Sequence, residues 1–355
     1  MNLTPASIPE LQDLLKTHMH FLPKGGGSKP ALLSSNRGAV LEMSALSGIV
    51  EYDPAEFTIT AWAGTPLTQI TDVLAEQGQY LPFDPPLQTR GATLGGTVAA
   101  GLSGPGRYRF GGVRDFLLGV SFIDAAGREV TSGAKVVKNA AGFGLERLLV
   151  GSMGRLGVIT QATFKVFPLP QAFASWRLQM SSLQEALAAL VRLRASPLEL
   201  WGLEVTPDLV LWARVAGSLE VIMPQAERVW KLMGEKGEIV EKEEAEFWLA
   251  AREFSWVPQG HGLVRVPIGL RQLPALDSSL RAQGVLAHYS AGGSLAWVDW
   301  PPSARPDALV MLLQSLALTG QPLFGPFYQP QIGNIETNAL YNRVKSVLDP
   351  LDKLG

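Results

Sequence analysis

The spacing of apolar and polar positions distinguishes strands from helices in the first half of the chain. Apolar side chains at 57, 59, 61 and 63 alternate with Thr58, Thr60 and Trp62, which is the period of a half-buried strand. From Leu67 the spacing becomes helical, with Thr65 expected as the N-cap and Pro66 as the first helical residue. We also predict a helix over 8–16, a loop over 21–29, and strands over 117–124, 128–131 and 158–166, the first two joined by a tight turn at 125–127.

The second half mixes strands and helices in an order typical of an α+β domain, one form of which has two βαβ-like halves. We expect strands over 173–180, 200–205, 209–215, 262–268 and 294–299, and helices over 183–191, 225–234, 243–251 and 305–318. Pro168 and Pro170 end the strand over 158–166, so we place a domain boundary there. The predicted domains are residues 1–170, residues 171–330, and a C-terminal helix within 331–355 that packs back on the first domain.

Composition narrows the classes of function. Apolar residues form 46% and charged residues 17% of the 355 positions, which argues against disorder. The formal charge of −2 lacks the basic excess that nucleic-acid binding needs. Cysteine is absent, which removes disulfides, thiolate metal sites and iron–sulfur ligation. With no secretory signal and no transmembrane run, we expect a cytoplasmic protein, associated with the inner face of a membrane only through partners.

Glycine gathers in four clusters, at 25–28, 91–106, 138–144 and 151–157. Glycine loses more entropy on folding than any other residue, so its repeated use indicates close approach of backbone to a ligand, with N–H groups directed at an anion. A pyrophosphate is the natural ligand. The P-loop pattern is absent, and no G-x-G-x-x-G follows a strand with an acid about 20 residues later, so neither a P-loop nor a nicotinamide Rossmann fold is expected.

The ordered set PKGGGSK, ATLGGTVAAGLSGP, GVRDFLLGVSFIDAAGREV and VKNAAGFGLERLLVGSMGRLGVIT resembles the FAD-binding domain of the vanillyl-alcohol oxidase and p-cresol methylhydroxylase (PCMH-type) family. Within this family the likeness is greatest to the FAD-binding E subunits of glycolate oxidases. It is dense over residues 20–170 and weaker through SAGGSLAWVDW and NRVKSVLDP. The resemblance implies an α+β fold in which a two-subdomain FAD-binding domain precedes an α+β, ferredoxin-like cap domain.

The resemblance also implies which residues hold FAD. The loop Lys24–Lys29 would bind the pyrophosphate, residues 93–97 would line the flavin and diphosphate, residues 101–104 would pass close to the isoalloxazine ring, and residues 151–159 would cover the adenosine half. Arg114–Asp115 and Lys138–Asn139 lie in matching segments and contact FAD or form a structural pair beneath the loops. The implied set is Lys24, Gly25, Gly26, Gly27, Ser28, Lys29, Thr93, Gly95, Gly96, Thr97, Gly101, Ser103, Gly104, Gly151, Ser152, Gly157, Val158 and Ile159.

The chain departs from the family in ways that bear on its chemistry. No histidine lies between His20 and His261 and there is no cysteine, so we expect FAD to be bound without a covalent link. Met153 and Arg155 stand where many relatives have Glu and Thr, and the metal motif of catalytic relatives, H-G-D-G-N-x-H, is missing. We expect no metal, because His18 and His20 do not share a helix face.

Catalytic residues stay unassigned. His261 or His288 could act as a base, and Arg265 and Arg271 could clamp a carboxylate, but structural roles fit each of them as well. Tryptophans concentrate in the second domain, where they are expected to pack a core or an interface.

Three functions fit these observations. The leading one is the FAD-binding subunit of a glycolate oxidase-like complex that oxidises glycolate or another small 2-hydroxy acid to the 2-oxo acid. This chain would relay electrons or support assembly, with a larger FAD-binding catalytic subunit and an iron–sulfur subunit as partners. The alternatives are a stand-alone FAD-dependent oxidoreductase acting on an alcohol or 2-hydroxy acid, and a scaffold subunit without flavin.

Overall fold

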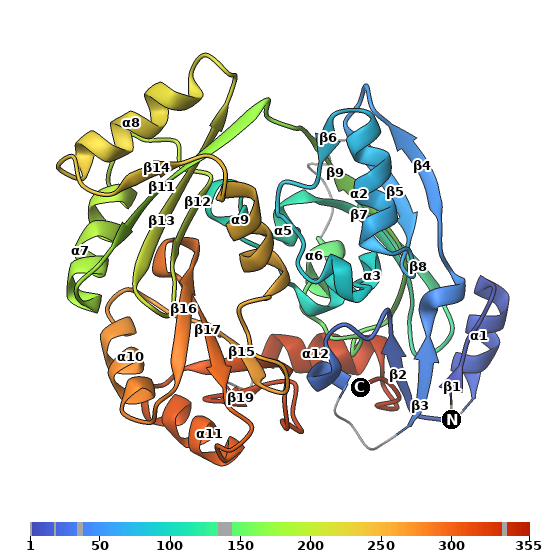
Figure 1. The fold of residues 1–355 in the computed structure, drawn as a ribbon. Helices are drawn as coiled ribbons and strands as arrows, with labels where there is room; N and C mark the ends of the chain where they lie inside the picture. Colours follow the sequence, from blue (N-terminus) through green and yellow to red (C-terminus); the bar gives the residue numbers. More distant parts are fainter. Residues whose placement is uncertain (1, 18, 34–37, 134–143, 336–338) are drawn as a thin grey trace. The chain divides into compact units, whose positions relative to one another are not determined.

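The computed structural model describes residues 2–17, 19–33, 38–133, 144–335 and 339–355, which fold into two compact units (Figure 1). Unit 1 comprises Met1–Ser103, Gly112–Leu169 and Glu336–Gly355, and unit 2 comprises Gly104–Gly111 and Pro170–Ile335. The N-terminal and C-terminal segments therefore belong to the same unit. No described helix combines the length and the apolar character that a membrane span requires.

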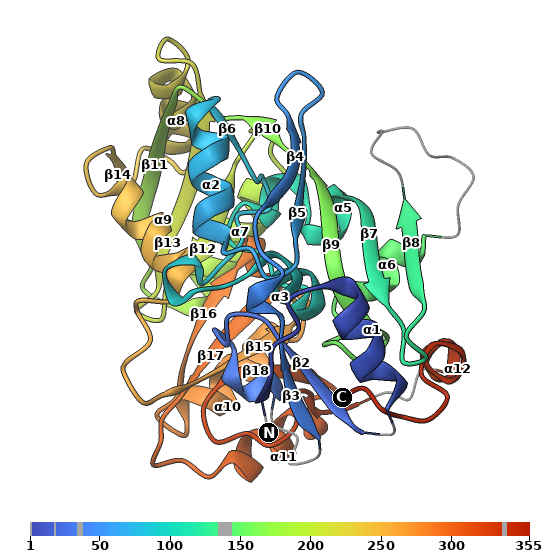
Figure 2. The same ribbon diagram turned by 90° about the vertical axis from the view of Figure 1, so that its right-hand side faces the viewer.

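Unit 1 contains a five-stranded antiparallel sheet and a three-stranded parallel sheet (Figure 2). The large sheet has the order β4-β5-β9-β7-β8, and the small one β1-β3-β2. The turn predicted at 125–127 joins β7 and β8, where the Asp124 carboxylate accepts hydrogen bonds from the N–H groups of Ala126 and Arg128. The strands are β1 (Asn2–Leu3), β2 (Phe21–Lys24), β3 (Ala39–Glu42), β4 (Ile49–Asp53), β5 (Thr58–Trp62), β7 (Leu117–Ile123), β8 (Glu129–Gly133) and β9 (Val158–Lys165), with the short pair β6 (Gln79–Tyr80) and β10 (Phe167–Pro168).

Two expectations for unit 1 are wrong. Residues 21–24 are not loop but strand β2, because their pairing with β3 outweighs the glycines that follow. Thr65 does not cap the next helix, since its hydroxyl bonds both backbone groups of Gly48 instead. The helices are α1 (Ile8–Lys16), α2 (Leu67–Glu76), α3 (Leu94–Ala100), α5 (Val113–Phe116), α6 (Leu145–Leu149) and α12 (Ala339–Leu348).

Unit 2 is built on a nine-stranded antiparallel sheet with the order β14-β11-β13-β12-β16-β17-β15-β18-β19. Two β-α-β-β-α-β sequences make it, β11-α7-β12-β13-α8-β14 and β15-α10-β16-β17-α11-β18, and each has the ferredoxin-like strand order. They join edge to edge through β12 and β16. The strands are β11 (Ala172–Gln179), β12 (Gly202–Val205), β13 (Val210–Gly217), β14 (Glu238–Val240), β15 (Gly262–Pro267), β16 (Leu286–Ser290), β17 (Leu295–Trp300), β18 (Thr319–Phe324) and β19 (Ile332–Gly333), and the helices α4 (Arg107–Phe110), α7 (Leu183–Arg194), α8 (Ile222–Leu232), α9 (Glu244–Glu253), α10 (Leu273–Arg281) and α11 (Pro306–Ser315).

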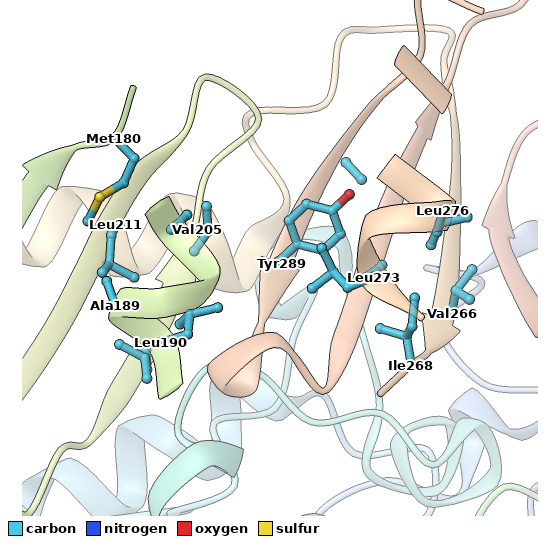
Figure 3. Packing of buried hydrophobic residues seen from close by; sticks show 14 of the residues in the cluster. Met180, Ala189, Leu190, Val205, Leu211, Val266, Ile268, Leu273, Leu276 and Tyr289 are labelled. Atoms are coloured by element: carbon cyan, nitrogen blue, oxygen red, sulfur yellow. The ribbon is translucent and has the colours of Figure 1, made fainter. Parts of the chain in front are cut away.

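The two faces of this sheet differ in chemistry. One face packs an apolar core against α7, α8, α10 and α11, with Val205, Leu211 and Tyr289 among the residues that interdigitate there (Figure 3). Because side chains alternate along each strand, the intervening residues point to the opposite face. That face carries polar and aromatic groups that are nevertheless buried: Ser175, Glu204, Trp212, His288, Ser290 and Trp297.

Candidate functional site

Two cavities of unit 1 share a wall. The shared wall is the end of β2 with the first glycine after it, and part of α3. Gly26 to Lys29 close the first cavity, and residues 154–159 close the second. The common lining residues are Pro23, Lys24, Gly25, Gly96 and Ala99.

Glycine is required at three positions of these walls. A Cβ on Gly26 would lie 1.7 Å from the carbonyl oxygen of Gly91, and one on Gly25 would lie 2.2 Å from the Thr93 hydroxyl. A Cβ on Gly95 would lie 2.6 Å from that of Ala63. The glycine clusters at 25–28 and 91–106 therefore serve to bring two backbone segments together around a cavity.

The loop after β2 offers donors for an anion. Among the described residues, no protein group accepts a hydrogen bond from the N–H groups of Gly26, Gly27 or Ser28. Gly95 differs, because its N–H donates to the Ala63 carbonyl at 2.8 Å and its contribution is limited to close approach. Thr93 caps α3, its hydroxyl accepting from the Gly96 N–H at 3.4 Å. Such free N–H groups are the donors that phosphate oxygens take.

The two lysines of the loop are not equivalent. Lys24 Nζ lies 3.1 Å from the Glu42 carboxylate, so its charge is already compensated. Lys29 is 8% exposed, and its Nζ donates to the Ser28 hydroxyl at 2.8 Å. No described carboxylate pairs with it, and burial lowers the pKa of Lys29 to about 8. A buried ammonium without a counterion is costly, which points to an anionic ligand at this place.

The structure brings most of the implied binding residues to these cavities. Thr97, Gly101, Ser103, Gly151 and Ser152 lie outside the linings, and Ser103 already accepts a hydrogen bond from the Val113 N–H at 3.0 Å. Gly104 falls in unit 2, and Lys138 and Asn139 lie outside the described residues. Asp115 bonds the Gly112 N–H rather than a ligand. Sequence reasoning missed the apolar wall residues Leu32, Leu33, Met43, Ala63, Ala99, Ala100 and Met153, whose side chains carry no motif.

Comparison with known proteins identifies the ligand of this architecture. A family model described as FAD binding domain matches residues 2–133, which include the loop after β2 and α3. This part of the chain is an FAD-binding domain. The cofactor expected from the sequence, FAD, is confirmed, and so is the resemblance to PCMH-type FAD-binding proteins.

The FAD-binding chain is similar to two groups of curated proteins. Glycolate oxidase subunit GlcE from Escherichia coli K12 is 42% identical over 212 residues, 60% of this chain and 60% of that protein. D-lactate dehydrogenase from Anaerostipes hadrus is 30% identical over 158 residues, 44% of this chain and 33% of that protein. The matched region thus spans from a third to three-fifths of these relatives' length.

A solved structure supports the fold. Alkyldihydroxyacetonephosphate synthase aligns with a TM-score of 0.73 and 19% identity over 99% of this chain and 76% of that one. At this identity the likeness concerns the fold alone. It confirms the predicted α+β class with a PCMH-type FAD-binding domain.

The residues of the FAD-binding domain fit the diphosphate of the cofactor. Unused N–H groups and an uncompensated Lys29 line the first cavity. The hydroxyl oxygens of Thr97 and Ser152 are buried and have no hydrogen-bond partner in the described residues. Neither residue lines either cavity, so the donors that fit the diphosphate are the N–H groups and Lys29.

Unit 2 holds the histidines and arginines singled out from the sequence. His288 Nε2 lies 2.8 Å from the Glu204 carboxylate, and both side chains are almost fully buried beside a small cavity that Phe254, Trp256 and Trp297 also line. Glu204 further accepts hydrogen bonds from the Ser290 hydroxyl (2.8 Å) and the Ala291 N–H (3.2 Å). With Nε2 bound to Glu204, the Nδ1 of His288 has no partner among the described residues.

The other candidates of unit 2 are placed differently. His261 Nδ1 lies 2.7 Å from the Asp299 carboxylate, in a pair that is partly exposed. Arg265 donates to the Gln321 side chain at 3.1 Å, and burial, helped by the charge of Arg107, lowers its pKa to about 10. Arg271 is exposed. The described residues contain no cluster of three or more His, Asp or Glu side chains that could hold a metal ion.

Proposed function

We propose that this chain is the FAD-binding subunit of a glycolate oxidase-like complex that oxidises glycolate or another small 2-hydroxy acid to the 2-oxo acid. The observation that carries the proposal is the loop of free N–H groups and uncompensated Lys29 in a domain of the FAD-binding family. The 42% identity to a glycolate oxidase subunit supports the choice of complex.

In this proposal the chain binds FAD without a covalent link. The N–H groups of Gly26 to Ser28 donate to the diphosphate, and Lys29 neutralises part of its charge. Gly25, Gly95 and Gly96 allow the backbone to approach, while Gly157, Val158 and Ile159 line the second cavity. Bound FAD supplies the capacity to accept two electrons from an organic substrate.

We propose a larger FAD-binding catalytic subunit and an iron–sulfur subunit as partners, in the cytoplasm or at the inner face of the membrane. Two features support a role in electron relay or assembly. The chain contains no cysteine to hold an iron–sulfur cluster, and the described residues offer no metal cluster. These tasks therefore belong to partner chains in this assignment.

The test is purification of the chain, first alone and then co-expressed with the genes that neighbour its own. We expect a yellow protein with a flavin spectrum that co-purifies with a second flavoprotein and an iron–sulfur protein. Glycolate should bleach the flavin of the complex much faster than the flavin of the isolated chain. A colourless chain that takes up no added FAD would favour a flavin-free scaffold instead.

A stand-alone oxidoreductase is the second candidate, and the Glu204–His288 pair is the observation that favours it. A carboxylate that fixes the imidazole tautomer of a histidine lining a cavity is the arrangement of an oriented general base. Turnover of a 2-hydroxy acid by the purified chain with an artificial acceptor, lost in His288→Gln, would support this candidate. No turnover by the wild-type chain would leave the subunit role.

A further inference from the structure

The residues that follow α12 pair with β2, the strand that leads into residues 25–29, called the phosphate loop below. The N–H of Phe21 donates to the Lys353 carbonyl at 2.7 Å, and the Gly355 N–H donates to the Phe21 carbonyl at 3.2 Å. Leu354 thereby forms a parallel bridge with Phe21 and enters the same buried core. This pairing covers the outer edge of β2 four residues before Gly25, the first residue of the phosphate loop.

Lys345 of α12 links this C-terminal segment to the second cavity. Its Nζ donates to the Leu354 carbonyl at 2.9 Å and to the Arg155 carbonyl at 3.3 Å. Arg155 lies between Gly154 and Gly157, which line the second cavity. One ammonium group therefore holds both the C-terminal segment and a cavity wall.

Buried polar contacts fix the position in which the C-terminal segment docks. The Asp349 carboxylate, 3% exposed, accepts from the N–H groups of Lys353 (2.8 Å) and Leu354 (2.9 Å) and from Lys345 Nζ (2.8 Å). Lys353, 6% exposed, donates from Nζ to the carbonyls of Leu15 (2.9 Å) and Ala125 (3.4 Å). Any other placement would leave these groups buried without partners, which is costly.

We propose that residues 345–355 form a clasp that sets the spacing between the two walls of the FAD cavity, with Lys345 as the positioning residue. The walls meet where a Cβ on Gly154 would lie 3.2 Å from the Pro23 ring, so a small shift of either wall changes the room for the cofactor. The inference rests on the proposed placement of FAD in this cavity. Because coupling is reciprocal, FAD must stabilise the docked clasp by the factor by which the clasp tightens FAD.

The test compares FAD affinity in three variants of the full chain, followed by flavin fluorescence. Lys345→Met removes the ammonium and keeps most of the side-chain volume, and should raise the Kd for FAD about tenfold. Lys345→Arg keeps donors to both carbonyls and should stay within about threefold of wild type. Thr163→Val is the matched control, because it breaks a buried hydrogen bond to Thr60 (2.9 Å) in unit 1 away from both cavities. It should lower stability and leave the Kd within about twofold.

Hydrogen exchange of the wild-type protein tests the reciprocal effect without any variant. FAD should slow exchange at Phe21, Leu354 and Gly355 more than at the β7–β8 hairpin. Equal slowing everywhere, or equal loss of affinity in Lys345→Met and in a Thr163→Val protein of matched stability, would overturn the clasp. Failure of the wild-type chain to bind FAD would instead overturn the proposed function, so the two failures are distinguishable.

Discussion

Replacing Lys29 with methionine should weaken FAD binding and stabilise the free protein at the same time. Burial lowers the pKa of Lys29 from 10.5 to about 8, and at about 1.4 kcal/mol per pH unit the charged group costs the free fold roughly 3 kcal/mol. Two unit charges 4 Å apart attract by about 4 kcal/mol at an effective dielectric of 20, so the diphosphate offsets this cost. We therefore expect the Kd for FAD to rise at least about 30-fold, which corresponds to about 2 kcal/mol. The free energy of unfolding of the flavin-free protein should rise by about 1–3 kcal/mol.

The assay for Lys29→Met is titration of flavin-free protein with FAD, paired with urea unfolding of the same sample. Lys16→Met is the matched control, since Lys16 belongs to unit 1, is 60% exposed and pairs only with Asp13 in the described residues. It should change neither quantity measurably. Unchanged FAD affinity in Lys29→Met, or a less stable flavin-free protein, would refute the view of Lys29 as an uncompensated cation for the diphosphate.

The pH dependence tests the same group with a defined sign. Between pH 8 and 10.5 the unfolded chain holds the Lys29 proton and the flavin-free fold has released it, so the free energy of unfolding should rise across this window. FAD affinity should fall above pH 8, because binding the diphosphate then requires uptake of a proton. Both effects should be absent in Lys29→Met.

Three further predictions concern the FAD site and unit 2. Gly26→Asp should abolish FAD retention, because its carboxylate would face the diphosphate and its Cβ would lie 1.7 Å from the Gly91 carbonyl oxygen; full retention in the purified variant would contradict the site. Acid precipitation should release all the flavin, and colour left in the pellet would contradict non-covalent binding. Glu204→Gln should lower the free energy of unfolding by about 3 kcal/mol in urea, since it breaks a buried pair. The control is Glu199→Gln, because Glu199 is exposed and pairs with Arg109 at the surface. This variant should lower the free energy of unfolding by less than about 1 kcal/mol. Equal losses of stability in Glu204→Gln and Glu199→Gln would be evidence against this account.

The sequence predicted the helices in which apolar residues keep a helical spacing over two turns, and the strands in which apolar and polar residues alternate over four positions. Helix α1 and the β7–β8 hairpin lie where expected, whereas β16, α10 and β18 were missed. Strand β18 contains Gly320 and Pro322, which are poor strand residues, and it is held by pairing with β15. Strand β16 has only five residues, and the exposed Leu286, on the same face as His288 and Ser290, breaks its alternation. These elements are determined by the strands they pair with and the residues that bury them, and the local sequence pattern does not show either.

The glycine clusters revealed two walls of the candidate site, because close approach of two backbone segments requires glycine and glycine is visible in the sequence. The apolar lining residues Met43 and Ala63 left none, since any medium or small apolar side chain would look the same in the sequence. The difference between Lys24 and Lys29 was also hidden. It depends on Glu42, eighteen positions from Lys24, which only the pairing of β2 with β3 brings beside it.

The division of unit 1 among three stretches of chain has a consequence for biosynthesis. Its last stretch, Glu336–Gly355, is translated after all of unit 2. At 5–20 residues per second the ribosome needs on the order of ten to thirty seconds to pass through unit 2, during which that unit can fold while the earlier-made unit 1 waits. The unit whose synthesis starts first is therefore completed last.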